Sequence, residues 1–207
     1  MSIAPTETAL FLCPELAGTL MTPEEFEAVE DYEEGYRYEL IHGVLVVTPV
    51  PLAEEADPNE ELGHWLRDYR EGHQEGKVLD ATLPQQYVRT RTSRRLADRL
   101  IWAGLGRLPH RVRDVPTIAV EFVSARRRDR QRDYVDKRRE YMEAGIAEYW
   151  IVDRFRRTLT VVRNEPGGPA ESAHGAEETY RTPRLPGFEL PLGRLLAVAD
   201  SWAAQDG

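Results

Sequence analysis

Two acidic residues stand where the surrounding sequence is apolar. Glu121 interrupts the run Ile118-Ala119-Val120-Glu121-Phe122-Val123, and Asp98 comes just before the apolar residues 100–102. A carboxylate in a buried strand is costly unless it is paired or holds a cation. If the two runs form neighbouring strands, Asp98 and Glu121 can both bind one hard cation, Mg²⁺ or Mn²⁺. The alternatives are an ion pair with an arginine for Glu121 and an ordinary strand start for Asp98.

Lys137 is the third residue that could take part in chemistry. Only two of the 27 basic residues are lysines, and this one lies in an arginine-rich segment. A compact ammonium can approach a water or a phosphate as a point charge where a guanidinium fork does not fit. Asp133 and Tyr141 lie one turn before and after Lys137, on the same helix face. The alternative is a lysine placed by chance on a solvated helix.

Several other kinds of catalytic site are absent from the sequence. It has no glycine-rich phosphate loop ending in Lys-Ser/Thr and no Gly-x-Ser-x-Gly elbow. It has no cysteine or histidine cluster for zinc, and its five histidines lack ligand-like spacing. The acidic pair and the lysine are therefore the main candidates for chemistry.

The charge distribution is uneven. The formal net charge is −9, and acidic residues crowd the first third of the chain. Residues 126–139 instead contain eight basic and three acidic residues. This segment is either a solvated helix face or a strip that faces phosphates. The candidates for nucleic-acid binding are Arg126, Arg127, Arg128 and Arg130.

The length and composition are typical of one globular α/β domain. We expect an N-terminal arm over residues 1–20, a single domain over 21–200, and a flexible loop over 164–178 within it. No stretch is long and apolar enough to span a bilayer, so no membrane association is expected. One cysteine and no basic N-terminal region lead us to expect a cytoplasmic protein.

The elements that must position these residues alternate between helices and strands. Thr22-Pro23 begins a short helix, and His42-Gly43 is a turn between two strands of a hairpin. Asp57-Pro58 begins a helix that ends near Gly72. The other predicted strands are 77–81, 85–89, 98–103, 116–124, 149–153 and 158–163. A charged helix over 130–144 ends at Gly145, and residues 185–198 form a final packing segment.

The order and spacing of these motifs resemble the Uma-two family of restriction-endonuclease-like proteins. The similarity covers residues 21–198, and its most specific part is Glu-Tyr-Trp-Ile-Val-Asp at 148–153 with Lys137 upstream. The resemblance implies an α/β fold with a PD-(D/E)XK core. Such a core has a mixed central sheet flanked by helices, here with an extra N-terminal β-hairpin.

The resemblance also implies roles for particular residues. Asp98 and Glu121 match the family's catalytic acids, with Mg²⁺ or Mn²⁺ as the implied cofactor. The lysine that often lies two residues after the glutamate is absent, because Val123 occupies that position, and Lys137 would replace it from the following helix. Glu39, in the Tyr-Glu-Leu part of the hairpin, would be a fourth catalytic group. The chain has Ala97 and Thr117 where the family usually has proline and aspartate.

These observations lead to two hypotheses about function. The first is a metal-dependent endonuclease that hydrolyses phosphodiester bonds, with nucleic acid, DNA in preference to RNA, as its partner. Enzymes that cut both strands often work as homodimers, so we expect a homodimer. The second is a catalytically inactive nuclease fold that binds nucleic acid or serves in protein assembly, which the acidic surface favours.

Overall fold

The computed structural model describes residues 10–124 and 132–203, with side chains for all of these except 132, 133 and 203. The described residues form a mixed α/β structure, as the sequence predicted. They divide into two compact units, where a single domain was expected. The N-terminal unit contains residues 10–50 and 89–96, and the main unit contains the rest. The hairpin thus groups with the residues that precede it and with residues 89–96.

The main unit contains a mixed central sheet with the strand order β10-β9-β8-β7-β6, and β5 also pairs with β6. Its strands are β5 (Leu79–Arg89), β6 (Arg94–Ala103), β7 (Ile118–Phe122), β8 (Glu148–Asp153), β9 (Thr158–Glu165) and β10 (Gly168–Gly175). Strands β7 and β8 are parallel, whereas β6–β7, β8–β9 and β9–β10 are antiparallel. The parallel pair brings the carboxyl ends of β7 and β8 to the same edge of the sheet.

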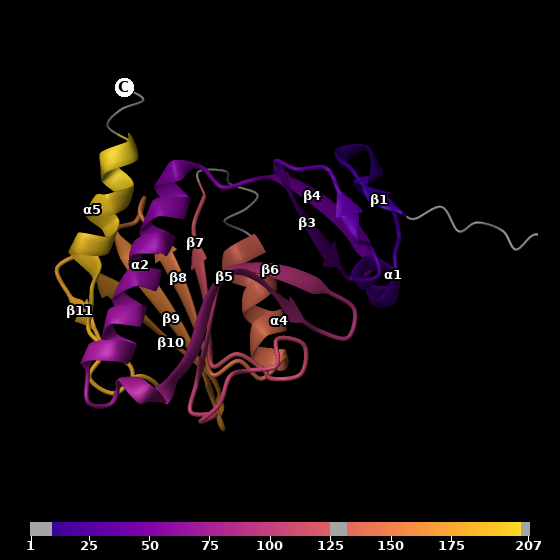
Figure 1. Cartoon of the computed structure of the whole chain (residues 1–207). Coiled ribbons are helices and arrows are strands. Elements are labelled where there is room, and N and C mark those ends of the chain that lie inside the picture. The colour runs from indigo at the N-terminus through magenta and orange to yellow at the C-terminus, as the bar shows by residue number, and fades with distance from the viewer. Residues whose placement is uncertain (1–9, 125–131, 204–207) are drawn as a thin grey trace, which may run out of the picture. The chain divides into compact units, whose positions relative to one another are not determined.

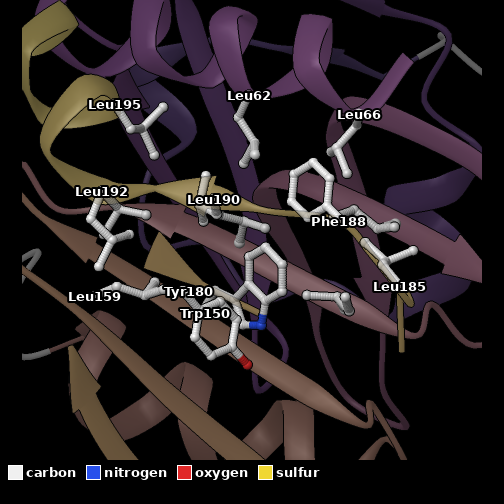
Figure 2. Close-up of a cluster of buried hydrophobic side chains, with 14 of the residues drawn as sticks. Leu62, Leu66, Trp150, Leu159, Tyr180, Leu185, Phe188, Leu190, Leu192 and Leu195 are labelled. Atoms are coloured by element: carbon white, nitrogen blue, oxygen red, sulfur yellow. The ribbon is translucent and has the colours of Figure 1, made fainter. Parts of the chain in front are cut away.

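Two helices of the main unit cover one face of the sheet. Helices α2 (Ala53–Gly72) and α5 (Leu192–Ala203) lie side by side on that face (Figure 1). Figure 2 shows Leu62 and Leu66 of α2 and Leu195 of α5 in one buried cluster with Trp150 of β8. Burying this apolar surface is the main force that holds these helices to the sheet.

A shorter helical segment covers the opposite face. It consists of a π-helical turn, η3 (Arg132–Lys137), followed directly by α4 (Arg138–Glu143). Tyr141 and Met142 of α4 belong to a second buried cluster with Ala119 of β7 and Tyr149 of β8. The helix ends at Glu143, and Gly145 follows its C-cap with a φ of +87°, which only glycine adopts easily, so the predicted terminating glycine is confirmed.

Strand β7 is buried along its whole length. Successive side chains of a strand point to opposite faces of the sheet. Val120 and Phe122 pack with the α2 and α5 cluster, whereas Ala119 and Val123 pack with the α4 cluster. Glu121 therefore points to the α4 face, and its carboxylate is buried there.

The N-terminal unit contains the predicted hairpin, made of β3 (Tyr36–Ile41) and β4 (Val44–Pro49). Both turn residues have positive φ, +49° at His42 and +80° at Gly43, which is typical of the tight turns that join two strands. The first residues of β6 belong to this unit, and Leu40 pairs with Arg94. Helix α1 (Pro23–Glu27) begins after Thr22, as predicted, and Thr22 forms a capping box with Glu25.

Two segments predicted to be irregular are ordered strands. Within the predicted arm, β1 (Phe11–Leu12) pairs with β2 (Asp31–Tyr32), and Leu20 forms a bridge with Val44. Residues 164–178, predicted to be a flexible loop, contain the end of β9 and all of β10. The residues of β10 are mostly small or polar, so they lack the apolar pattern that predicts a strand. An edge strand can be held by its hydrogen bonds to the next strand with little side-chain packing.

Two boundaries also differ from the prediction. Helix α2 begins at Ala53, so Pro58 lies inside it and not at its first position. The predicted start was wrong because it relied on the preference of proline for the first turn of a helix. An internal proline removes one helix hydrogen bond, and α2 tolerates this loss at Pro58. Residues 77–81 and 85–89, predicted as two strands, are largely one strand, β5, with a positive φ at Gln85.

The remaining elements are short. They are the 3₁₀ turns η1 (Pro14–Leu16) and η2 (Gly76–Val78) and the strands β11 (Thr179–Tyr180) and β12 (Leu190–Pro191). No helix in residues 10–124 and 132–203 is long and apolar enough to cross a membrane.

Candidate functional site

Asp98 and Glu121 lie close together on the main sheet. Strands β6 and β7 are antiparallel, with Arg99 opposite Val120, and continuing this register by one pair places Asp98 opposite Glu121. Opposed residues of an antiparallel pair share a face of the sheet. The Oδ2 atom of Asp98 accepts a hydrogen bond from the backbone N–H of Phe122 at 2.8 Å. Both carboxylates are buried. The two strands that carry them are neighbours, as the sequence predicted.

The helical segment on that face provides two donors to Glu121. The Nζ atom of Lys137 lies 2.7 Å from Oε2, and the Tyr141 hydroxyl donates to Oε1 at 2.9 Å. The two donors are four residues apart, so they project from successive turns of one helical face. The side chains of Lys137 and Glu121 are each only 4% exposed. One ionic partner of Glu121 is thus the unusual lysine.

Tyr141 was noted in the sequence only for its position on the Lys137 face. Its ring is fully buried and meets the ring of Tyr149 edge-on, with the centroids 5.0 Å apart. This packing fixes the direction of its hydroxyl, because a buried aromatic ring has few alternative rotamers. Tyr141 therefore holds one oxygen of Glu121 in place. The spacing Lys137-x3-Tyr141 was the signal for this role.

Asn59 of α2 supports Asp98 from the opposite face of the sheet. Its Nδ2 donates to the Asp98 backbone carbonyl at 2.8 Å, and its Oδ1 accepts from Nε of Arg99 at 2.7 Å. Burial lowers the pKa of Arg99 to about 10. A Cβ at position 63 would lie 2.5 Å from Nη2 of Arg99, so a side chain there would force the Arg99 guanidinium to move.

Asn59 was not predicted from the sequence. The available signal was its spacing, because residues 59, 62 and 66 lie on one helical face and Leu62 and Leu66 are buried. A polar residue on the buried stripe of an amphipathic helix indicates a specific hydrogen-bond partner.

Tyr134 anchors the segment that carries Lys137. Its hydroxyl donates to Oδ2 of Asp153 at 3.0 Å, at the carboxyl end of β8. Burial, together with the nearby Asp153 carboxylate, raises the pKa of Tyr134 to about 12. Tyr134 therefore stays protonated at neutral pH and acts as a hydrogen-bond donor. This bond links the π-helical turn to the edge of the sheet where β7 and β8 end.

The other predicted site residues lie in the N-terminal unit or outside the described residues. Glu39 is a buried residue of β3 in the N-terminal unit, where its Oε1 accepts from the backbone N–H of Leu96 at 2.9 Å. Leu96 comes two residues before Asp98 in the chain, but a place for Glu39 in the site stays a prediction. The four predicted nucleic-acid-binding arginines, Arg126, Arg127, Arg128 and Arg130, lie outside the described residues.

The chemistry of these donors fits a hard divalent cation with few protein ligands. Asp98 and Glu121 present carboxylate oxygens from neighbouring strands on one face, and such oxygens are ligands that Mg²⁺ and Mn²⁺ prefer. Two carboxylates side by side on one face of the sheet attract a cation. Among the described residues, no group of three or more His, Cys, Asp or Glu side chains could hold a metal ion. Mg²⁺ commonly uses one or two carboxylates and keeps several waters, so two are enough.

Comparisons with known proteins agree with this fold and with the family resemblance. The model of the Uma2 family, described as "Putative restriction endonuclease", matches residues 23–193. A solved structure titled as a putative nuclease belonging to DUF820, from Anabaena variabilis ATCC 29413, superimposes with a TM-score of 0.68. That match covers 86% of this chain and 99% of the other at 12% sequence identity, so it bears on the fold alone. No curated protein matches the chain.

Proposed function

Because the chain belongs to the Uma2 family, we propose that it is a metal-dependent endonuclease that hydrolyses phosphodiester bonds, with DNA as its substrate. The family's description supports a nuclease function. The observation that carries the proposal is the pairing of Asp98 with Glu121 on neighbouring strands, with the Lys137 ammonium 2.7 Å from Glu121. A carboxylate pair with one lysine is a set of groups suited to phosphodiester hydrolysis.

Asp98 and Glu121 would hold Mg²⁺ or Mn²⁺, together with the backbone carbonyl of Phe122. When bound, such an ion supplies a water of lowered pKa and offsets negative charge on the phosphate. The Phe122 N–H fixes Oδ2 of Asp98, and the Tyr141 hydroxyl fixes Oε1 of Glu121. These bonds preorganise the two carboxylates before substrate arrives.

Lys137 would act on the reacting groups directly. Its ammonium can turn from Glu121 towards an incoming phosphate or water and donate a hydrogen bond there. A positive charge placed where negative charge develops on the phosphate stabilises the transition state. Exclusion of water strengthens this effect, and the lysine side chain is nearly fully buried.

Cleavage of supercoiled plasmid DNA with Mg²⁺ or Mn²⁺ tests the proposal. We expect nicked or linear products from the wild type and at least about 100-fold slower cleavage by Asp98→Asn, which keeps the shape of the side chain. Equal rates for the two proteins, or cleavage that persists in EDTA, would contradict the proposal. Thermal unfolding of both proteins serves as the control for folding.

A second candidate function has its own supporting observation. Both oxygens of Glu121 already have donors from the chain, and Lys137 neutralises it without an ion. A catalytically inactive nuclease fold that binds nucleic acid or assembles with a protein would keep this closed arrangement. Calorimetric titration with Mn²⁺ separates the two functions, since the enzyme requires binding that Asp98→Asn weakens. No heat of binding would favour the inactive fold.

The expected homodimer belongs to the same proposal, because two copies of the site can cut both strands of a duplex. Light scattering on the purified chain tests it. A mass of twice 23.7 kDa is the expected result. A monomer that nonetheless linearises plasmid in one binding event would contradict the need for two copies.

A further inference from the structure

The turn between β8 and β9 lies at the edge of the sheet where the candidate site ends. Glu121 of β7 pairs with Ile151 of the parallel strand β8. The turn, residues 154–157, begins three residues after Ile151, which is roughly 10 Å along the strand. The turn therefore lies on the same edge as the carboxylates, at a distance that one or two nucleotides of a bound strand can span.

The turn combines arginines with an exposed aromatic ring, in the sequence Arg154-Phe155-Arg156-Arg157. Phe155 is 41% exposed, and the guanidinium of Arg154 lies 4.4 Å from the centre of its ring. Cationic side chains beside exposed aromatic rings are typical of surfaces that bind single-stranded nucleic acid, where bases stack and phosphates are neutralised.

Asp153 holds the turn in a single conformation. Its carboxylate is fully buried, and Oδ1 accepts from the backbone N–H groups of Phe155 at 2.9 Å and Arg156 at 3.0 Å. Its other oxygen accepts from Tyr134, in the segment that carries Lys137. The turn and the helical segment that carries Lys137 are thus both hydrogen-bonded to the Asp153 carboxylate. A preorganised turn loses little entropy when it binds a ligand.

The three arginines differ in how far they are available to a ligand. Arg154 is mostly buried and lies 3.7 Å from Glu54, and Arg157 binds Asp200 at 2.6 Å. The side chain of Arg156 is 65% exposed, and its guanidinium lies 5.0 Å from the centre of the Tyr134 ring. Its carboxylate neighbour, Asp153, is 3.7 Å away and already accepts three shorter hydrogen bonds. Arg156 is therefore the guanidinium best placed to meet a phosphate.

From these contacts we propose that the 154–157 turn is part of the nucleic-acid-binding surface. Arg156 contacts a backbone phosphate next to the scissile bond, and Phe155 stacks on a base of the same strand. This inference rests on the proposed nuclease function, because it takes the carboxylate pair as the place of cleavage.

Fluorescence anisotropy with labelled DNA in EDTA tests the inference without cleavage. We expect Arg156→Gln to weaken binding about 3- to 10-fold at low salt, and to reduce the slope of log affinity against log salt by about 1. Arg181→Gln is the matched control, since the Arg181 side chain is 63% exposed and also has a carboxylate neighbour, Glu189. Arg181 follows Tyr180, whose hydroxyl contacts Glu148 at the other end of β8. Phe155→Ala should weaken binding to single-stranded DNA more than to duplex DNA.

The outcomes separate this inference from the proposed function. If wild type binds DNA and Arg156→Gln binds as Arg181→Gln does, the turn is not part of the surface, and the proposed function is unaffected. If Arg156→Gln raises KM for cleavage with unchanged kcat, the inference is supported by a readout that loss of folding would not give. If wild type neither binds nor cleaves DNA, the proposed function fails and the inference fails with it.

Discussion

Two buried glutamates on neighbouring strands have different surroundings. Glu148 begins β8 and pairs with Ile118 at the start of β7, whereas Glu121 lies three residues further along β7. Both residues are buried. Both have donors from the chain, so burial and hydrogen bonding alone do not separate a structural carboxylate from a catalytic one.

Glu148 is surrounded by donors. It accepts hydrogen bonds from the Trp150 indole at 2.9 Å, the Tyr180 hydroxyl at 3.1 Å and the Thr182 hydroxyl at 2.8 Å, and Arg163 lies 3.6 Å away. Burial and the Glu148 charge raise the pKa of Tyr180 to about 12, so this donor keeps its proton at neutral pH. These contacts offset the cost of burying the charge, as in a structural site.

Glu121 instead faces a second carboxylate. Asp98 lies opposite it on β6, and the ammonium of Lys137 lies 2.7 Å from the Oε2 atom of Glu121. Like charges placed together cost stability, and an arrangement of this kind is common where function requires it. The comparison teaches that a second carboxylate on the facing strand, more than burial itself, marks the candidate site.

The largest expected effect comes from neutralising each glutamate in turn. Glu121→Gln should slow metal-dependent DNA cleavage by about 100-fold or more, because it removes a carboxylate from the site. Glu148→Gln should leave the cleavage rate of the folded protein within about 2-fold of wild type, since Glu148 has no part in the proposed chemistry. Initial rates of plasmid nicking measure both. A comparable loss in Glu148→Gln, with its fold intact, would remove the distinction.

The second prediction concerns the lysine. Lys137→Arg should slow cleavage by about 10- to 100-fold despite keeping the positive charge, because a guanidinium cannot take the position of an ammonium 2.7 Å from Glu121 in a buried site. Arg163→Lys, beside Glu148, is the matched exchange and should not change the rate. Full activity of Lys137→Arg would show that charge alone matters there.

The surroundings of Glu121 could be predicted in part from the sequence, whereas those of Glu148 could not. Glu121 was visible because it interrupts an apolar run, and Lys137 because lysine is rare in this chain. Their direct contact could not be predicted, since it depends on how the helix lies across β7. The four contacts of Glu148 come from residues up to 34 positions away, and no local pattern reveals such a set.

The fold was predictable where local chemistry dominates. The capping box at Thr22, the turn at His42-Gly43 and the glycine after α4 each fix a boundary through their own side chains or φ angles. Strand β10 was missed because its order comes from pairing with β9, and Asn59 was missed because its partners lie about 40 residues away. Features that depend on hydrogen-bond partners far away in the sequence could therefore not be predicted from the sequence alone.

The third prediction removes one hydroxyl from each carboxylate. Tyr141→Phe should lower kcat about 3- to 10-fold with little change in KM, because Glu121 loses the donor that fixes Oε1. Tyr180→Phe removes the equivalent donor from Glu148 and should cost about 1 kcal/mol of unfolding free energy with kcat unchanged. Steady-state kinetics and urea unfolding measure the two effects. Equal kinetic effects would mean that Tyr141 only supports the fold.

The smallest expected effect is stabilisation by metal. A cation that binds the folded chain alone raises its unfolding free energy, and Mn²⁺ at a concentration equal to its Kd should contribute about 0.4 kcal/mol. For a chain of this size that is an increase in Tm of roughly 1–2 °C. Asp98→Asn should abolish the increase, whereas Glu148→Gln should keep it from a lower starting Tm. An equal increase in all three proteins would place the ion elsewhere, because Asp98→Asn is the one variant that changes the proposed metal site.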